Sequence, residues 1–207
     1  MTVPSTSPSP APAWSQAPLL QGRHVTLEPM NLDHAEGLRQ ALGDGELSKL
    51  WYTNVPVPTQ ARAYIEAALR MQQEGTALPF VVRDAGGAIV GSTRYYDLAA
   101  DVPRLAIGYT WYAPSVQRTG LNTEAKLLLL AHAFDRLGCV SVMLETSWFN
   151  QASRAAIARL GAKQDGVLRG HRRHADGSVR DTVVFSIIES EWPAVRRHLQ
   201  ARLEAHA

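Results

Sequence analysis

A small-residue turn that runs directly into an apolar helix limits most strongly how this chain can fold. The turn spans residues 117–125 (QRTGLNTEA), and the leucines at 127–130 follow it. The first N–H groups of a helix have no partner within it, so such a turn can bind phosphate. Asn122 is expected to cap the helix and Glu124 to complement its dipole. A ligand-free turn has the same local signature, and the P-loop and three-glycine dinucleotide motifs are both missing.

Hydrophobic spacing divides the rest of the chain into strands and helices. Strands are expected at 24–28, 80–83, 88–95, 104–111, 140–145, 167–171 and 180–188. Helices are expected from Asn31 or Asp33 to Leu42, from Thr59 to Gly75, from Asn122 to Gly138, from Asn150 to Gly161, and after Ser190. Glycine-containing turns at 84–87 and 174–178 indicate two hairpins. The pattern predicts an α+β fold whose strands between 80 and 111 form an antiparallel meander.

Composition indicates one globular domain with a weak positive charge. The chain has 207 residues, 45% of them hydrophobic, and a formal net charge of +2, which is too small to argue for nucleic acid. Residues 1–18 are rich in Pro, Ser and Ala and carry no charged side chain, so we expect a disordered leader before a domain at 19–207. The lone Cys139 excludes an intrachain disulfide. With no signal peptide or long apolar run, the expected location is the cytoplasm, without membrane partners.

Two further motifs accompany the turn and carry a family resemblance. Residues 107–111 (IGYTW) precede it by one short loop, and 150–153 (NQAS) follow one strand after the long helix. Together they resemble the GNAT acetyltransferases, and more narrowly the branch of ribosomal-protein N-acetyltransferases. The residues that match this branch are Gln117, Gly120, Thr123, Glu124, Ala125, Asn150, Ser153, Leu160, Gly161 and Ala162. The chain departs from the branch at Arg118, where glycine is usual, and at Asn122, where a smaller residue is common.

The resemblance implies a GNAT fold and acetyl-coenzyme A as cofactor. That fold has a twisted, mostly antiparallel sheet flanked by helices, with a V-shaped splay between the fourth and fifth strands, here 104–111 and 140–145. Pantetheine would pair with backbone in the V, and coenzyme A pyrophosphate would bind the N–H groups of the turn. The residues expected to bind the cofactor are Thr110, Trp111, Tyr112, Gln117, Arg118, Thr119, Gly120, Leu121, Asn122, Thr123, Asn150 and Ser153.

Acetyl transfer to an amine requires a neutral nitrogen, donors for the developing oxyanion and an acid for the departing thiolate. Ser153 is the candidate acid, although its hydroxyl could instead serve the Asn150 cap. Asn150 is expected to orient the cofactor or its loop, and simple helix capping is the alternative. Glu145 is the candidate base, unless its side chain points to solvent. Proton removal through ordered water would need no dedicated carboxylate.

The acceptor is described less well than the donor. Candidate acceptor-site residues are Trp51, Tyr52, Tyr95, Tyr96 and Asp97, because in this fold the first helix–helix loop and the strand after the hairpin border that site. Asp97 could attract an ammonium group, whereas the aromatic residues could equally belong to the core. Basic residues gather at Arg169, His171, Arg172, Arg173, His174 and Arg180. They could bind an acidic surface, RNA or the 3′-phosphate of coenzyme A, or form a solvated hairpin, and we expect no metal site.

The sequence therefore predicts an N-acetyltransferase that acetylates a primary amine by direct attack in a ternary complex. The amine could belong to a protein N-terminus or to a small molecule such as an antibiotic or a polyamine. The alternative is a non-catalytic module that binds coenzyme A or associates with RNA. A homodimer remains open.

Overall fold

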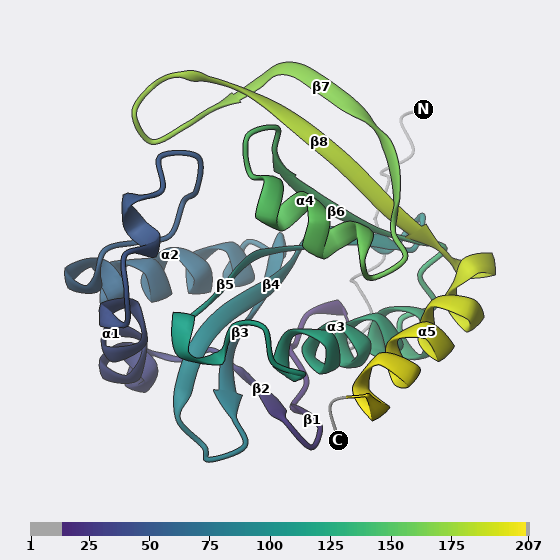
Figure 1. The fold of residues 1–207 in the computed structure, drawn as a ribbon, viewed down its shortest axis with the longest axis horizontal. Helices are drawn as coiled ribbons and strands as arrows, with labels where there is room; N and C mark the ends of the chain where they lie inside the picture. The colour runs from purple at the N-terminus through teal and green to yellow at the C-terminus, as the bar shows by residue number, and fades with distance from the viewer. Residues whose placement is uncertain (1–13, 206–207) are drawn as a thin grey trace, which may run out of the picture.

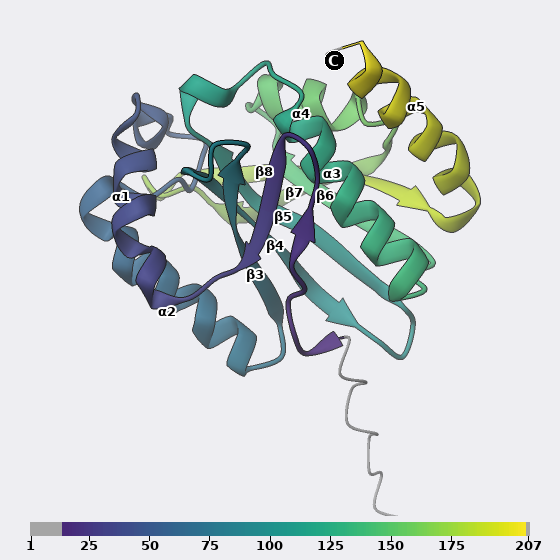
Figure 2. The same cartoon turned by 90° about the horizontal axis from the view of Figure 1, so that it is seen from below.

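The computed structural model describes residues 14–205, which form one eight-stranded sheet with helices on both faces (Figures 1 and 2). The strands are β1 (Leu20–Gln21), β2 (Val25–Pro29), β3 (Ala77–Asp84), β4 (Ile89–Ala99), β5 (Arg104–Tyr112), β6 (Ser141–Ser147), β7 (Lys163–Arg173) and β8 (Val179–Ile188). Their order across the sheet is β1-β2-β3-β4-β5-β6-β8-β7. The helices are α1 (Ala35–Gly43), α2 (Ala61–Gln73), α3 (Leu121–Ala131), α4 (Gln151–Ala158) and α5 (Trp192–Glu204). The predicted α+β architecture is confirmed.

Strands β5 and β6 form the only parallel pair among the strands that the structure describes, and they separate part-way along their length. Their pairing runs from Arg104 with Ser141 to Ile107 with Leu144. Both strands continue further, β5 paired with β4 and β6 paired with β8. The facing edges of β5 and β6 beyond Ile107 are therefore unpaired. This is the predicted splay between the fourth and fifth strands, which are β5 and β6 once the two-residue β1 is counted.

The sheet is buried on both faces, and β3 shows how the two cores form. Phe80 and Val82 lie in the larger core with α3 and α5, whereas Val81 lies in the smaller core with α1 and α2. Successive strand residues point to opposite faces, so helices on both faces require an almost continuous apolar strand. Figure 2 shows the α1–α2 and α3–α5 layers on either side of the sheet.

The predicted leader ends earlier than residue 18. Trp14 is 8% exposed and packs in the larger core, because a large aromatic ring gains from burial wherever the chain can return to the sheet. The leader prediction for 1–18 therefore meets a docked Trp14 at its end, and residues 1–13 lie outside the described residues. Between 14 and 205 no helix is long and apolar enough to cross a bilayer.

Helix starts differ from the sequence prediction more than helix ends do. Asn31 caps a short 3-10 turn before α1, close to the prediction. Thr59 and Ser190 lie inside 3-10 turns that precede α2 and α5, so neither is the predicted cap. Asn122 is also wrong as a cap, because α3 begins at Leu121 with Gly120 at the N-cap position. The predicted end at Gly138 is confirmed by its positive φ of 65°, after a π-helical turn at His132–Arg136.

Candidate active site

A cleft opens where β5 and β6 separate. Its volume is about 440 Å³, and its walls come from both strands, the start of α3, α4 and the loop between α1 and α2. The predicted site residues that line it are Tyr52, Thr110, Trp111, Tyr112, Gln117, Asn122, Glu145, Asn150 and Ser153. Tyr96, also named as an acceptor-site candidate, lines it too. The splay thus brings together residues that are far apart in the sequence.

Two side chains of the turn 117–125 are hydrogen-bonded to the backbone just before it. Gln117 donates from Nε2 to the Tyr112 carbonyl at 2.9 Å, and the Thr119 hydroxyl donates to the Val116 carbonyl at 2.7 Å. The N-cap residue Gly120 has no side chain to cap α3, and Thr119 Oγ1 accepts from the Leu121 N–H at 3.3 Å. The N–H groups that follow in the first turn can meet an anion. Arg118 is exposed and has a φ of 63°. Glycine adopts this left-handed conformation without steric cost, which explains why it would suit this position.

Glu124 anchors the start of α3 to the turn between β1 and β2. Its carboxylate accepts hydrogen bonds from the backbone N–H groups of Arg23 at 2.9 Å and His24 at 2.5 Å. The residue is 9% exposed, and a Cβ on Gly22 would lie 2.4 Å from its Cδ. Glu124 lies in the first turn of α3, as the dipole prediction requires, and its carboxylate also joins α3 to the turn between β1 and β2.

Glu145 projects into the site rather than to solvent. Its side chain is 7% exposed, and Oε2 accepts from Arg172 Nη2 at 3.2 Å and from the Tyr96 hydroxyl at 3.4 Å. Burial, followed by the negative charge of Glu145, raises the pKa of Tyr96 well above its ordinary value. Tyr96 therefore stays protonated and donates to the carboxylate. The solvent-facing alternative for Glu145 is wrong.

Asn150 and Ser153 meet at the first turn of α4. Asn150 Oδ1 accepts from the Ser153 backbone N–H at 3.0 Å, so Asn150 is the N-cap. The cap uses the backbone of Ser153, not its hydroxyl. Ser153 is half-buried and lines the cleft, so its hydroxyl remains available to a ligand.

Comparison with known proteins now identifies the family. The family described as "Acetyltransferase (GNAT) domain" matches residues 24–163. The chain belongs to the GNAT acetyltransferase family. It is accordingly an acetyl-CoA-dependent acetyltransferase.

Relatives agree with that assignment over most of the chain. "Uncharacterized N-acetyltransferase YoaA" of Bacillus subtilis is 25% identical over 175 residues, covering 83% of this chain and 97% of its own. A solved structure titled a putative acetyltransferase from T. thermophilus is 32% identical with a TM-score of 0.79, covering 89% and 96% of the two chains. Mycobacterium smegmatis RimJ in complex with CoA-disulfide is 23% identical with a TM-score of 0.72, covering 86% and 88%. At this identity the last likeness concerns the fold alone.

Lys126 is a residue of this GNAT cleft that the sequence interpretation missed. It is 5% exposed, and its Nζ donates to Thr110 Oγ1 at 2.9 Å. Burial lowers the pKa of Lys126 to about 7. A signal was present, because Lys126 lies three and four positions before Leu129 and Leu130 and so shares their buried helix face.

The acceptor-site candidates separate in the structure. Tyr95 is fully buried in the larger core, where its hydroxyl donates to the Leu129 carbonyl at 2.6 Å. The prediction that Tyr95 contacts substrate is therefore wrong. Trp51 lies outside the cleft lining, 46% exposed, with its ring 5.2 Å from Phe149 and 5.0 Å from His174. This contact joins the loop before α2 to the tip of the β7–β8 hairpin (Figure 1).

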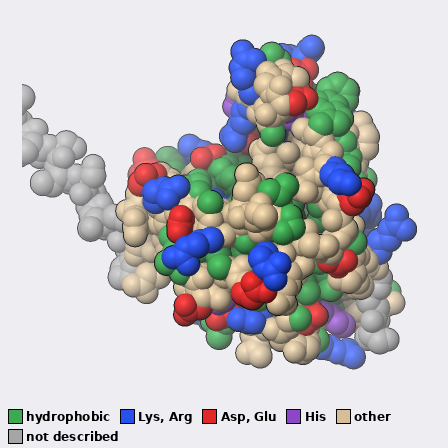
Figure 3. All heavy atoms as spheres, turned by 90° about the vertical axis from the view of Figure 1, so that its left-hand side faces the viewer, with side chains coloured by type: hydrophobic (Ala, Val, Ile, Leu, Met, Phe, Trp, Pro, Cys, Tyr) green, Lys and Arg blue, Asp and Glu red, His purple; other side chains and the backbone are tan. Residues whose placement is uncertain are grey.

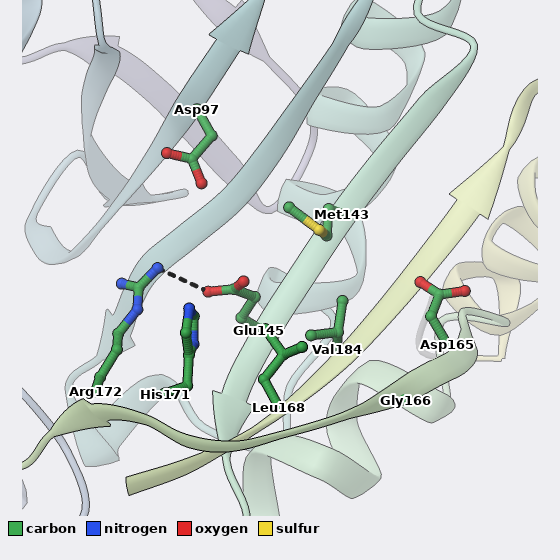
Figure 4. Close-up of a pocket in the computed structure, with 9 residues that line it drawn as sticks. All are labelled: Asp97, Met143, Glu145, Asp165, Gly166, Leu168, His171, Arg172 and Val184. Atoms are coloured by element: carbon green, nitrogen blue, oxygen red, sulfur yellow. Dashed lines mark hydrogen bonds and ion pairs between the residues drawn. The ribbon is translucent and has the colours of Figure 1, made fainter.

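Asp97 lines a second cavity of about 430 Å³ instead of the cleft. Glu145 and Arg172 line both spaces, and Figure 4 shows their ion pair among the residues of the second cavity. Asp97 is exposed and has a φ of 51°, at an irregularity in the pairing of β4 with β5. Asp165 lines the same cavity and accepts from the Ser186 hydroxyl at 3.0 Å.

Proposed function

We propose that the enzyme acetylates a primary amine by direct attack on acetyl-coenzyme A in a ternary complex. The observation that carries this proposal is the end of β5–β6 pairing at Ile107 and Leu144. An unpaired strand edge offers N–H and C=O groups to an extended ligand. Here that edge borders the cleft and leads toward the N-terminus of α3, where the N-cap Gly120 carries no capping side chain.

The residues present fit the pantetheine arm and the pyrophosphate of coenzyme A. The backbone of Thr110, Trp111 and Tyr112 would hold the pantetheine arm, and the N–H groups from Arg118 to Thr123 would hold the pyrophosphate. The exposed Arg118 guanidinium can add a contact to phosphate. When bound, the cofactor supplies an acetyl thioester. The protein's share is to hold that group beside the acceptor amine and to move protons.

Glu145 is proposed to accept the proton of the amine, directly or through water. A carboxylate held by Tyr96 and Arg172 keeps its position as the ammonium group arrives. During transfer the amine nitrogen forms a bond to the acetyl carbon, and the bond from that carbon to sulfur breaks. Ser153 is proposed to give a proton to the departing thiolate and to take back the second proton that the amine nitrogen releases, while Asn150 positions the turn that carries Ser153.

Calorimetry with acetyl-coenzyme A and a turnover screen read by mass spectrometry test this function together. The screen includes small amines, polyamines, aminoglycosides and N-terminal ribosomal peptides, since both acceptor classes fit the proposal. Binding followed by acetylation of at least one amine is expected. A folded protein that fails to bind the cofactor would overturn the donor site, and binding without any transfer would favour a non-catalytic module.

Two variants test the roles of the named side chains. Ser153→Ala and Glu145→Gln are each expected to reduce kcat by about 10- to 100-fold with little change in cofactor affinity. Ser190→Ala and Glu189→Gln are matched controls, because both residues are exposed in the turn before α5. An unchanged kcat would reject the role of the residue concerned.

The face of the molecule that carries α1 and α2 gives little support to RNA association. The face that carries α1 and α2 mixes Lys and Arg with Asp and Glu side chains (Figure 3). Nucleic-acid binding surfaces are typically single-signed. Binding of RNA with a steep salt dependence would nevertheless revive that alternative.

A further inference from the structure

The β7–β8 hairpin places two arginines directly opposite each other beside the cleft. Arg172 of β7 pairs in register with Arg180 of β8. Like charges in directly opposed positions destabilise an antiparallel pair. Both residues line the cleft, together with Lys126, whereas Glu145 is the one acidic residue among the described residues that line it. The acceptor side of the cleft therefore carries an excess of positive charge.

Glu145 neutralises only one of the two arginines. Its carboxylate is 3.2 Å from Arg172 Nη2, and the Arg180 Nε is buried without a hydrogen-bond partner. Burial, followed by the positive charge of Arg172, lowers the pKa of Arg180, with Glu145 acting in the opposite direction. The guanidinium remains charged at neutral pH. Arg180 is thus a partly buried cation, and one further negative charge would be needed to neutralise it.

The second cavity is lined by more negative than positive side chains. Asp97 and Asp165 line it, together with the ion pair between Glu145 and Arg172 (Figure 4). His171 is the remaining titratable group of its lining besides that pair. An ammonium group is attracted to this acidic side, and an anion is attracted to Arg180. A molecule that carries both charges can place its ammonium group beside Glu145, which lines both spaces, and its anionic group at Arg180, which lines the cleft.

We propose that the acceptor is a small primary amine that also carries a carboxylate, as an amino acid does, and that Arg180, assisted by Arg172, binds this carboxylate. The inference rests on the proposed acetyl transfer. Two guanidiniums against one carboxylate leave a single excess positive charge, which one further carboxylate neutralises. The planar guanidinium also fits the two oxygens of a carboxylate. The amine of the same molecule then lies near Glu145, its proposed base.

In this arrangement Arg172 and Arg180 do not bind the phosphates of coenzyme A. The phosphate-binding N–H groups lie at the turn after β5, whereas Arg180 lies on β8, which pairs with β6. Its partner Arg172 contacts the same carboxylate that is proposed to meet the amine. The donor and acceptor ends of the cleft are therefore held by different strands.

The test compares carboxylate-bearing amines with their neutral carboxamides. A panel of amino acids, β-alanine and γ-aminobutyrate, each with its carboxamide, is assayed for acetylation and for binding in the presence of coenzyme A. With the wild-type enzyme, kcat/KM for the best acid is expected to exceed that for its amide by about 100-fold. Equal rates for acid and amide would overturn the proposal, as would a strict preference for peptides or for aminophosphonates.

Arg180→Met assigns the preference to its residue. The variant is expected to lose about 100-fold in kcat/KM for the acid, to keep the rate for the amide, and to bind acetyl-coenzyme A unchanged. Arg180→Lys should recover part of the loss. Arg173→Met is the matched control, since Arg173 is an exposed residue of the same hairpin that contacts the Gly177 carbonyl. A weaker affinity for acetyl-coenzyme A would instead assign the pair to the donor.

Calorimetric binding of the acid separates this proposal from the proposed function. If acid binds in an Arg180-dependent way without acetyl transfer, the carboxylate site stands and the catalytic function fails. If transfer occurs with amines regardless of a carboxylate, the function stands and the carboxylate site fails.

Discussion

Replacing Lys126 with methionine is expected to stabilise the protein at neutral pH, although the change removes a hydrogen bond. The Lys126 side chain is buried, and burial lowers its pKa from 10.5 to about 7. The difference between these two values corresponds to roughly 5 kcal/mol of unfavourable free energy for the charged form in the folded state. Methionine has a similar length and carries no charge.

The hydrogen bond that the substitution removes contributes less free energy than the burial of the charge costs. Lys126 Nζ donates to Thr110 Oγ1, and a bond of this kind contributes about 1 kcal/mol. Thr110 Oγ1 also lies 2.8 Å from Thr93 Oγ1, so the hydroxyl keeps a partner in the variant. The net gain in unfolding free energy is therefore about 2–4 kcal/mol at pH 7.

Lys126 also makes the stability of the wild-type protein depend on pH. The unfolded chain holds the Lys126 proton up to about pH 10.5, whereas the folded protein releases it near pH 7. Between these values the unfolded state binds more protons, so wild-type stability gains about 1.4 kcal/mol per pH unit from this residue as pH rises. The unfavourable contribution is complete below pH 7 and absent above pH 10.5. The advantage of Lys126→Met is expected to shrink steadily from pH 7 to pH 10.

Urea denaturation at pH 6, 7, 8, 9 and 10 measures this difference. Lys163→Met is the control, because the Lys163 side chain is 76% exposed beside Glu191, and it should show little change across the series. A Lys126→Met protein that is less stable than wild type at pH 7 would refute the reasoning. A stability difference that does not vary with pH would refute it equally.

Three further substitutions test how the cleft is built. Gly91→Ala is expected to destabilise by about 2–3 kcal/mol in thermal unfolding, because a Cβ would lie 2.3 Å from the Trp111 carbonyl oxygen and force β4 from β5; a wild-type Tm would contradict this packing. Glu124→Gln weakens two backbone hydrogen bonds and should cost about 2 kcal/mol in urea denaturation, with an unchanged midpoint as the contrary result. Asn150→Ala removes the α4 cap and should cost about 1 kcal/mol in the same assay, whereas equal stability would show that the cap contributes nothing.

Local signals predicted the elements better than their first residues. Gly75 and Gly138 adopt the left-handed conformation that ends a helix, a preference set by the residue itself. Which residue caps a helix depends on the chain that precedes it. Pro58 starts a 3-10 turn, so Thr59 lies inside that turn and does not cap α2. Similarly, the turn before α3 is shaped by the Thr119 hydroxyl, so Asn122 falls inside the helix.

Neighbouring tyrosines on β4 show where strand periodicity stops being informative. Residues 90–96 are all buried, so alternation between apolar and polar residues disappears. Tyr95 points to α3 and Tyr96 to Glu145, a difference decided by the partners on each face. Sequence alone treats the two as equivalent acceptor-site candidates. Only the packed sheet separates a core residue from a site residue.

The opposition of Arg172 and Arg180 depends on an irregularity that no local pattern specifies. Leu168 pairs with Thr182, and a regular hairpin continued from there would place Arg172 opposite Ser178. The register shifts between Leu168 and Arg172, where Gly170 has a φ of 60° and its N–H donates to Asp181 Oδ1 at 2.8 Å. The shift brings two like charges into direct opposition, which lowers stability in the absence of an anion. Bulges occur preferentially beside active sites, where they redirect side chains, and here the redirected side chain lines the cleft at the acceptor side.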